Sequence, residues 1–317
     1  MRAGNIRCMN NKLINWGIFI LLCFVWGSSF ILMKESLKGF TVVQIASFRI
    51  FSAGLVFFPF AIFHVSKIPG RKLGFVALAG LFGNLLPAFC FVAAINKLDS
   101  SLASILNSLT PICVAGIAVT FFKARIQTQK MLGILAGFGG LCLLTLYHKS
   151  ISLDNIGYAL LVVAATLMYG INVNLVGHYL KDCKPIHIAT VSLSLMAIPS
   201  LFVLWQQGFF QLDFSESKIQ WALINSSLLG ITASAFATVI FYMLVQRAGG
   251  LFASLVTYGV PFVALFWGFL DGEKITAIEI VALCIILFGV YLANRPGKKE
   301  DDPVIAGSSD EFDFEKS

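Results

Sequence analysis

Apolar residues in this chain occur in long runs rather than in alternation with polar ones. We identify ten runs of about 18 residues or more, bounded by charges, glycine or proline. Roughly 20 apolar residues span the ~30 Å core of a bilayer as a helix, whereas barrel strands show a period of two. The predicted membrane-spanning helices are approximately 13–33, 41–63, 73–95, 101–122, 130–147, 156–180, 185–205, 220–246, 250–270 and 276–294.

The composition supports this prediction. Hydrophobic residues make up 58% of the 317 residues and charged residues 12%, with a mean hydropathy of +0.85. Soluble domains carry about 25% charged residues, so the outer surface of this chain is expected to face a lipid bilayer. An all-α membrane protein is therefore predicted. A cytosolic enzyme, a secreted disulfide scaffold and, despite the net charge of +7, a nucleic-acid-binding module are excluded.

Positive residues are distributed unevenly over the predicted loops. With a cytoplasmic N-terminus, inner segments hold 16 of the 23 Lys and Arg residues and outer segments hold six. Positive residues favour the cytoplasmic side, so both termini are expected there, in a multi-pass protein of the cell (inner or plasma) membrane. The tail 295–317 changes from basic to acidic and is expected to be a disordered cytoplasmic segment.

The two halves of the chain match each other in order. The matches include 103–111 with 253–261 and Phe91 with Phe241 at an offset of 150, and Trp26 with Tyr169 at an offset of 143. They predict a first repeat over 13–147 and a second over 154–294. Each repeat holds five spans, an odd number, so the second repeat must enter the membrane from the opposite side. Ten helices arranged as two inverted five-helix repeats are therefore expected.

Together these features resemble the drug/metabolite transporter (DMT) superfamily, EamA type. The resemblance covers about residues 13–294. It rests on the ten-helix plan, Trp26-Gly27-Ser28, Arg49, Pro111, Pro261 and Gly272-Glu273-Lys274. It implies a transporter, and efflux rather than uptake. One departure is Lys123-Ala124-Arg125, where such proteins often carry a Gly-Glu-Arg-like turn, so the resemblance assigns no role to an acidic residue there.

Two prolines mark where a substrate site is expected. Pro111 and Pro261 occupy matching positions in spans four and nine. A proline inside a helix leaves the carbonyl four residues earlier without its donor. Interrupted helices in matching positions are the best indication of the site in inverted-repeat transporters, so we predict two helix breaks here. The alternative is a packing notch or a lipid-facing kink.

Polar and aromatic side chains halfway along the spans are the predicted substrate contacts. A polar group at that depth needs a partner or a water-filled cavity. These residues are Trp26, Asn84, Asn107, Thr110, Tyr169, Asn172, Ser234, Thr257 and Tyr258. The alternatives are hydrogen bonds between helices for the asparagines and ordinary packing for Trp26 and Tyr169. Ser234 and the nearby Thr238 can also bond to their own helix backbone.

Arg49 is the only ionisable side chain that lies eight residues or more from both ends of a predicted span. It is therefore about 12 Å from the outer end of its helix. An unpaired cation at the bilayer centre costs about 3 kcal/mol on insertion scales, so a partner or water is required. Glu35 is a candidate partner; bonding to carbonyls and snorkelling are alternatives. Arg49 is expected to be a structural clamp or a contact for an anion.

His187 is a candidate for proton coupling, because only histidine titrates near neutral pH without perturbation. An interfacial position near the inner end of span seven is the alternative explanation. The sequence contains no GxxxxGK[ST] loop, no HExxH motif and no CxxC pair. No catalytic residue, cofactor or metal is therefore expected, and the cysteines are expected to be free thiols.

These observations predict a secondary transporter or facilitator for a small organic metabolite. The predicted cavity lacks deep carboxylates, which favours a neutral or zwitterionic solute such as an amino acid, moved by alternating access and exported. The alternatives are a membrane-embedded enzyme acting on a lipid or isoprenoid substrate and a non-transporting membrane interaction protein. The sequence leaves the oligomeric state open between monomer and homodimer.

Overall fold

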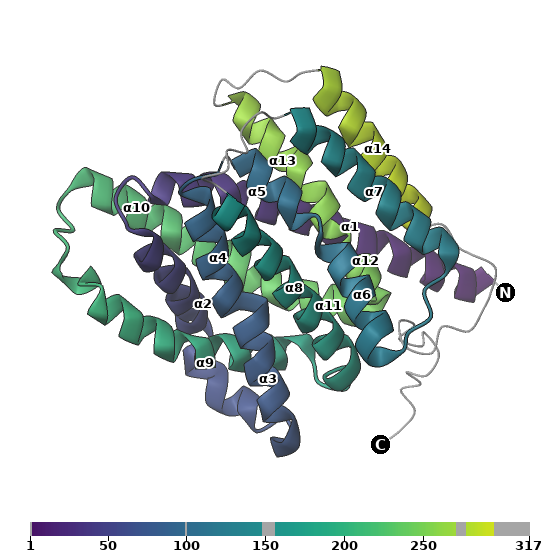
Figure 1. The fold of residues 1–317 in the computed structure, drawn as a ribbon. Coiled ribbons are helices and arrows are strands. Elements are labelled where there is room, and N and C mark those ends of the chain that lie inside the picture. Colours follow the sequence, from purple (N-terminus) through teal and green to yellow (C-terminus); the bar gives the residue numbers. More distant parts are fainter. Residues whose placement is uncertain (1, 99, 148–155, 271–276, 295–317) are drawn as a thin grey trace.

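The computed structural model describes residues 2–98, 100–147, 156–270 and 277–294, and these residues form helices and turns without a strand (Figure 1). The α-helices are α1 (Arg2–Ser36), α2 (Val42–Val65), α3 (Leu73–Gly80), α4 (Leu86–Ile95), α5 (Ser100–Asn107), α6 (Thr110–Phe122), α7 (Thr128–Tyr147), α8 (Ile156–Tyr179), α9 (Pro185–Gln206), α10 (Ser217–Leu228), α11 (Ala237–Ala248), α12 (Gly250–Ser254), α13 (Val256–Leu270) and α14 (Ala277–Asn294). Two π-helical segments are η2 (Leu81–Leu85) and η5 (Leu229–Phe236), and two short 3₁₀ turns are η1 (Gly70–Lys72) and η4 (Phe209–Gln211). The all-α prediction is confirmed, while the predicted disordered tail 295–317 lies outside the described residues.

The helices account for all ten predicted spans. Seven stretches of the described chain are long and apolar enough to cross a membrane: Lys12–Ser36, Val42–Val65, Gly70–Ile95, Ile156–Tyr179, Pro185–Gln206, Ser217–Ala248 and Gly250–Trp267. The shorter apolar helices Thr110–Phe122 and Ile280–Ala293 lie within predicted spans four and ten. The remaining predicted span corresponds to α7.

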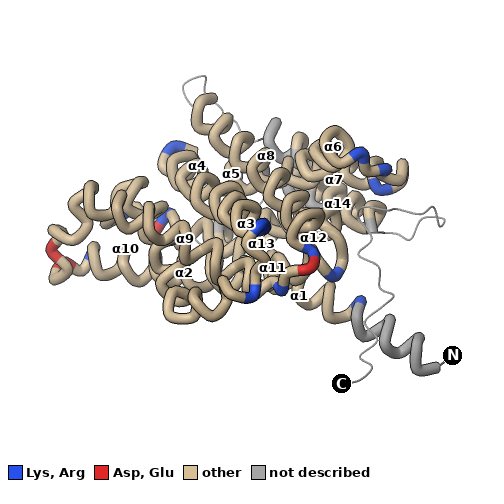
Figure 2. The backbone as a smooth tube through the Cα atoms, turned by 90° about the horizontal axis from the view of Figure 1, so that it is seen from below, with Lys and Arg blue, Asp and Glu red and all other residues tan. Residues whose placement is uncertain are grey.

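The outer surface is that of a membrane protein. Large apolar side chains point outward along the helices; Ile62 and Phe63 on α2, for example, are 77% and 71% exposed. Water would penalise such a surface, whereas hydrocarbon does not. Lys, Arg, Asp and Glu gather mainly near helix ends and in connections (Figure 2). The chain is therefore a multi-pass membrane protein.

Local sequence signals set several helix ends. Thr41 and Gln44 form a capping box at the start of α2, in which each side chain bonds the other residue's backbone N–H. Pro185 occupies the first turn of α9, where a missing N–H costs nothing. Lys123 ends α6 in the left-handed conformation with φ 51°. Glycine is the residue favoured in that conformation.

Interruptions occur at matching positions in the two repeats. The π-helical segments η2 and η5 lie within the third and eighth spans, and α5/α6 and α12/α13 divide the fourth and ninth. At Pro111 the helix is interrupted just before the proline, since α5 ends at Asn107 and α6 begins at Thr110. The predicted break at Pro261 is wrong. There α13 continues through the proline, and the chain is interrupted earlier, at Leu255.

Hydrogen bonds show why α13 tolerates its proline. Pro261 cannot donate to the carbonyl of Thr257, and the hydroxyl of Ser108 donates to that oxygen instead at 2.8 Å. In the first repeat, the carbonyl of Asn107 accepts the hydroxyl of Thr110 at 2.6 Å. A side chain therefore replaces each lost backbone donor, and Ser108 ties the α5–α6 connection of one repeat to the ninth span in the other.

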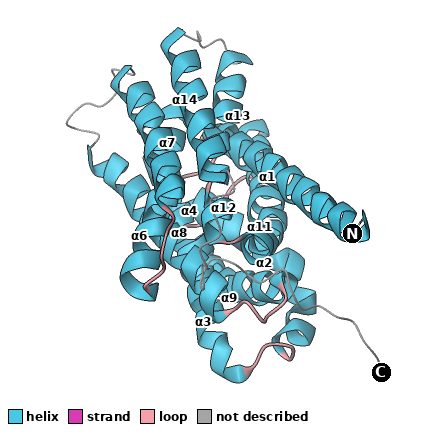
Figure 3. Cartoon of the chain, turned by 90° about the vertical axis from the view of Figure 1, so that its right-hand side faces the viewer, coloured by secondary structure: helices cyan, strands magenta, loops and turns pink. Residues whose placement is uncertain are grey.

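The repeats pack against each other through equivalent contacts. The second span pairs with the seventh as α2 and α9, and the fifth pairs with the tenth as α7 and α14, which lie side by side in Figures 1 and 3. On the α1 side, Gly27 lies so close to Val263 that a Cβ atom would overlap it. At the equivalent position on α8, Gly170 lies against Cys113, the residue equivalent to Val263. The offsets of 143 and 150 thus relate structural contacts as well as residues.

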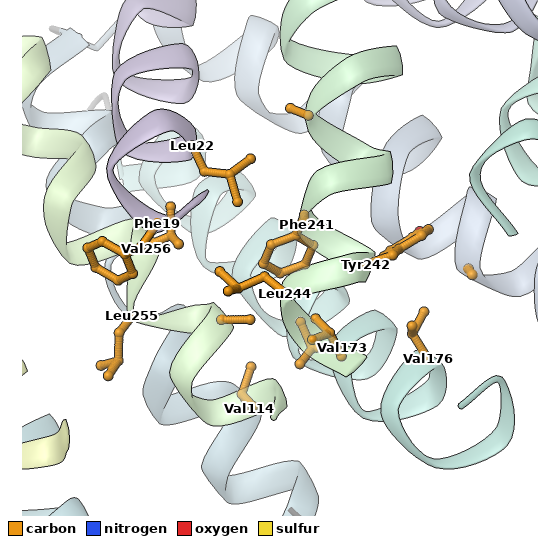
Figure 4. Close-up of a cluster of buried hydrophobic side chains, with 14 of the residues drawn as sticks. Phe19, Leu22, Val114, Val173, Val176, Phe241, Tyr242, Leu244, Leu255 and Val256 are labelled. Carbon is orange, nitrogen blue, oxygen red and sulfur yellow. The ribbon is translucent and has the colours of Figure 1, made fainter. Parts of the chain in front are cut away.

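Apolar side chains from both repeats share one core. Phe19 and Leu22 on α1 belong to the same buried cluster as Val114 on α6, Val173 on α8 and Phe241 on α11 (Figure 4). These helices lie far apart in the sequence. The cluster therefore holds the two repeats together rather than stabilising each one separately.

The close approach of α7 and α14 gives a first testable prediction. A Cβ at Gly133 would meet the backbone of Gly289 and Ala293, which cannot move aside, whereas Gly139 on the same helix has open space. We expect Gly133→Leu to lower the free energy of unfolding by about 3 kcal/mol relative to Gly139→Leu. Both variants gain the same helix propensity, so their difference isolates packing. Unfolding in detergent checks this, and equal stability of the two variants would contradict the described α7–α14 contact.

Candidate functional site

A cavity lies between helices of the two repeats. The space open to the centres of water molecules is about 70 Å³. Seven of the ten spans contribute side chains to its wall. The lining residues are Trp26, Ser29, Phe30, Met33, Arg49, Gly83, Asn84, Phe91, Asn107, Thr110, Tyr169, Asn172, Ala233, Thr238, Phe241, Tyr242, Ser254 and Thr257.

Two equivalent aromatic pairs form part of this wall. Trp26 on α1 packs against Phe241 on α11 with ring centroids 5.1 Å apart. Tyr169 on α8 packs against Phe91 on α4 at 6.0 Å. The repeat offsets relate Trp26 to Tyr169 and Phe241 to Phe91, so each repeat gives one ring to each pair. The cavity thus contains aromatic faces of both repeats in matching arrangement.

Trp26 also joins α1 to the irregular backbone of the eighth span. Its indole N–H donates to the carbonyl of Ala233 in η5 at 3.0 Å. In a π-helical segment the backbone N–H groups no longer follow the regular register, and such segments occur frequently at functional sites. Trp26 therefore supplies a donor where the helix is interrupted and holds its own ring at the cavity wall.

Amide and hydroxyl side chains supply most of the polar wall. Thr238 donates to Asn84 Oδ1 at 3.0 Å, and Tyr242 donates to Asn172 Oδ1 at 3.3 Å. The first bond joins α11 to η2 of the first repeat, and the second joins α11 to α8. Asn84 Nδ2 is buried and has no hydrogen-bond partner among the described residues. An unpaired buried donor costs about 1–3 kcal/mol, so this amide can offer a hydrogen bond to a ligand after a small rearrangement.

Arg49 reaches the cavity from α2. Its side chain is buried, and Nε donates to the hydroxyl of Ser234 at 2.7 Å. Glu35, the candidate partner, forms an ion pair with Lys38 at 2.7 Å and accepts from the indole N–H of Trp221 at 3.1 Å. Glu35 lies in the last turn of α1, beside the connection to α2 and beside α10, so its carboxylate is satisfied at the helix end.

The structure brings eight of the predicted residues to the cavity. They are Trp26, Arg49, Asn84, Asn107, Thr110, Tyr169, Asn172 and Thr257. Ser234 contacts Arg49 rather than the cavity, and Pro111 and Pro261 are not part of the lining. The hydroxyl of Tyr258 donates to the carbonyl of Ile134 at 2.9 Å, away from the cavity. Consecutive residues of a helix point about 100° apart, so Thr257 and Tyr258 do not share one face.

The sequence reasoning missed several lining residues. They are Ser29, Phe30, Met33, Gly83, Phe91, Ala233, Phe241, Tyr242 and Ser254. Most are apolar or small and carry no signal that separates a cavity wall from packed core. Phe91 and Phe241 are the exception, because the same aromatic residue stands at matching positions of both repeats.

The histidine prediction has a different structural setting. His187, at the start of α9, has Nδ1 2.8 Å from Nδ1 of His64 at the end of α2, and neither lines the cavity. At the other end of the same helix pair, Gln44 donates to the carbonyl of Gln207 at 3.1 Å. The offset of 143 relates His64 to Gln207 and Gln44 to His187. Equivalent residues therefore join both ends of α2 and α9. The contact is between two histidines at one end and between a glutamine side chain and a backbone carbonyl at the other.

Among the described residues, no group of three or more His, Cys, Asp or Glu side chains is placed to hold a metal ion. Six cysteines of the described chain are free thiols. The chemistry available at the cavity is therefore hydrogen bonding, aromatic contact and the charge of Arg49.

Known transporters are similar to this chain in sequence. The model of the EamA-like transporter family matches the chain twice, over residues 15–146 and 156–295. A chloroplastic WAT1-related protein of Arabidopsis thaliana is 26% identical, covering 93% of this chain and 72% of the relative. An uncharacterized transporter of Archaeoglobus fulgidus is 26% identical over 88% of this chain and 98% of its own length. The uncharacterized inner membrane transporter YedA of Escherichia coli K12 is 24% identical over 93% and 97%.

A solved crystal structure of a protein is also similar, with a TM-score of 0.65 and 14% identity. The match covers 87% of this chain and 95% of the other. At this identity the likeness shows the fold alone.

The histidine pair gives a second prediction. One Nδ1 must donate and the other accept, so the bond is lost when both imidazoles are protonated. Stability from this contact is therefore present above the ordinary histidine pKa of about 6.5 and lost as the pH falls below it. We expect the free energy of unfolding to fall by about 1 kcal/mol between pH 7.5 and 5.

The matched control replaces both histidines. His64→Gln with His187→Gln copies the residue type found at the other end of the helix pair, and it removes the titrating bond. The other histidines are common to both proteins, so their titration cancels. Unfolding in detergent across this pH range measures the difference, and identical pH dependence of the two proteins would contradict the expectation.

Proposed function

The chain belongs to the EamA-like transporter family, whose members are membrane transporters and not enzymes, and from this membership we propose that it is a secondary transporter of a small organic metabolite. The observation that carries the proposal is the central cavity. It is lined by equivalent side chains of both repeats, including the Trp26–Phe241 and Tyr169–Phe91 pairs. A site formed between repeats is the arrangement that alternating access requires.

Contacts among the connections support an inverted arrangement of the repeats. Two pairs join segments expected on the inner side: Lys72 with Asp182 at 3.0 Å and Arg247 with Asn15 at 3.0 Å. The ion pair with Lys72 lowers the pKa of the Asp182 carboxyl below its ordinary value. Glu35 and Trp221 join two segments expected on the outer side. These contacts support the inverted arrangement that we propose, and the excess of Lys and Arg in the inner segments supports cytoplasmic termini.

The size and chemistry of the cavity favour a small solute. The cavity leaves about 70 Å³ open to the centres of water molecules, which favours a small molecule. The lining residues that the structure describes include no Asp or Glu, so a multiply charged cation would find no counter-charge. Amides, hydroxyls and aromatic rings suit a neutral or zwitterionic solute such as an amino acid. We propose export as the direction, in line with the resemblance to drug/metabolite transporters.

The remaining alternative is a membrane interaction protein that transports nothing. Flux in liposomes containing the purified protein separates the two. Transport of any metabolite down its gradient, or against it with an imposed pH gradient, supports the proposed function. Absence of flux over a broad panel of metabolites, with folded protein, would reject it.

Two residues, Asn107 in the fourth span and Tyr258 in the ninth, test the placement of the site. Asn107 lines the cavity, whereas the Tyr258 hydroxyl faces Ile134. We expect Asn107→Ala to raise the KM for flux about 2- to 10-fold, the effect of losing one hydrogen bond. Tyr258→Phe should leave the KM unchanged. Unchanged kinetics for Asn107→Ala in folded protein would exclude it from the transport path.

A labelling experiment tests the inverted arrangement. Lys97 follows α4 and Arg247 lies at the end of α11, at equivalent positions of the two repeats. In a cysteine-free background, a membrane-impermeant maleimide should label Lys97→Cys in intact cells and Arg247→Cys only after permeabilisation. Lys218→Cys and Lys184→Cys serve as outer and inner controls. Labelling of positions 97 and 247 from the same face would reject inverted repeats and the proposed alternating access.

A further inference from the structure

Arg49 gives the cavity a single fixed charge. Among the described lining residues it is the only Lys, Arg, Asp or Glu. Its side chain is 9% exposed, so solvent compensates little of the charge. A cation removed from water is costly unless an anion or several hydrogen bonds replace its hydration.

The protein satisfies only part of this guanidinium. Nε donates to Ser234, which fixes the orientation of the planar group. Nη1 and Nη2 have no hydrogen-bond partner among the described residues. These two nitrogens, with their fixed fork of donors, are therefore left for a ligand in the cavity. A carboxylate matches that fork with two parallel hydrogen bonds, whereas a neutral amide does not.

The charge breaks the symmetry of the repeats. The offset of 143 relates Arg49 to Ser192. The packing agrees, because the carbonyl of Arg49 lies against Gly230 and that of Ser192 against the equivalent Gly80. Ser192 donates to the carbonyl of Ala189 on its own helix. One repeat therefore offers a cation where the other offers none, and a solute would have a preferred orientation in the cavity.

The rest of the wall suits the other end of such a solute. Amide and hydroxyl groups of Asn107, Asn172 and Thr257 accept hydrogen bonds from an ammonium or hydroxyl group. The rings of Trp26 and Phe241 offer π faces to a cation. A solute with one carboxylate and a polar or ammonium group would therefore have its charges matched.

We propose that Arg49 is the binding residue for a carboxylate and that the transported solutes are monocarboxylates, amino acids in zwitterionic form among them. Ser234 acts as a positioning residue that holds the guanidinium in plane. This inference rests on the proposed function and revises its substrate class: solutes without a carboxylate are left out, and monocarboxylate anions join the zwitterionic amino acids.

The test uses the purified full chain, first in detergent for binding and then in liposomes for flux. The panel contains the twenty standard amino acids and small aliphatic monocarboxylic acids. Binding is measured by the shift in melting temperature and flux by counterflow. The best solute is compared with its primary amide. The best amino acid is also compared with the carboxylic acid that lacks its amino group. The amide separates carboxylate recognition from shape, and the deaminated acid separates amino acids from simple carboxylates.

Three variants accompany the wild type. Arg49→Gln removes the charge, Arg49→Lys keeps the charge but loses the fork, and Ser192→Ala is the control at the equivalent position of the second repeat. We expect the wild type and Ser192→Ala to prefer the carboxylate over its amide by about 10- to 100-fold. Arg49→Gln should bind both forms within about threefold of each other, and Arg49→Lys should keep a reduced preference.

The outcomes separate this inference from the proposed function. If Arg49→Gln keeps the preference, or if the wild type binds no carboxylate of the panel or accepts the amide equally, the inference is rejected even where flux is observed. If carboxylates bind with Arg49-dependent preference but none crosses the liposome membrane, the inference holds and the transport proposal fails. If Arg49→Gln melts below the assay temperature, Arg49→Lys is tested in its place. An undiminished preference of Arg49→Lys for the carboxylate over its amide would also reject recognition by the guanidinium fork.

Discussion

Backbone hydrogen bonding in a medium without water is the constraint on which this structure depends. Hydrocarbon offers no partner to an N–H or C=O group, so every interruption of a membrane helix must be satisfied within the protein. Ser108 supplies the donor that Pro261 removes from the Thr257 carbonyl, and Trp26 donates to Ala233 in a π-helical segment. Each of these bonds crosses between repeats, so the same interactions that make the interruptions possible also fix how the halves meet.

The cavity is a consequence of those interruptions. Where a helix departs from its regular register, neighbouring side chains no longer interdigitate in one continuous stripe, and polar groups remain at mid-depth. Asn84 lies in η2 and Ala233 in η5, and both line the cavity. Low dielectric surroundings strengthen each polar contact there and penalise each unpaired group. A solute that supplies matching partners gains from both effects.

Contacts that are equivalent in the two repeats and residues that differ between them have separate roles. The aromatic pairs, the contacts of Gly27 and Gly170 and the two ends of α2 and α9 all follow the repeat. Arg49 has no equivalent charge, and the His64–His187 contact has an uncharged counterpart. In the alternating access that we propose, equivalent contacts would let the two halves exchange roles, and the unequal residues would make the two orientations of a solute differ in energy.

Hydrophobic periodicity and composition by themselves determined the fold class, the ten spans and the repeat, because helix length and lipid exposure are properties of contiguous residues. The position of polar and aromatic residues halfway along the spans also identified eight cavity residues, since a polar side chain in the middle of the membrane needs a partner or water. Side-chain direction and partners needed the tertiary structure. In the structure, Tyr258 donates to the carbonyl of Ile134, and Arg49 donates to Ser234 and not to Glu35. The helix α13 continues through Pro261, because Ser108 donates to the carbonyl of Thr257. Each outcome depends on a donor or acceptor that a helix distant in sequence supplies.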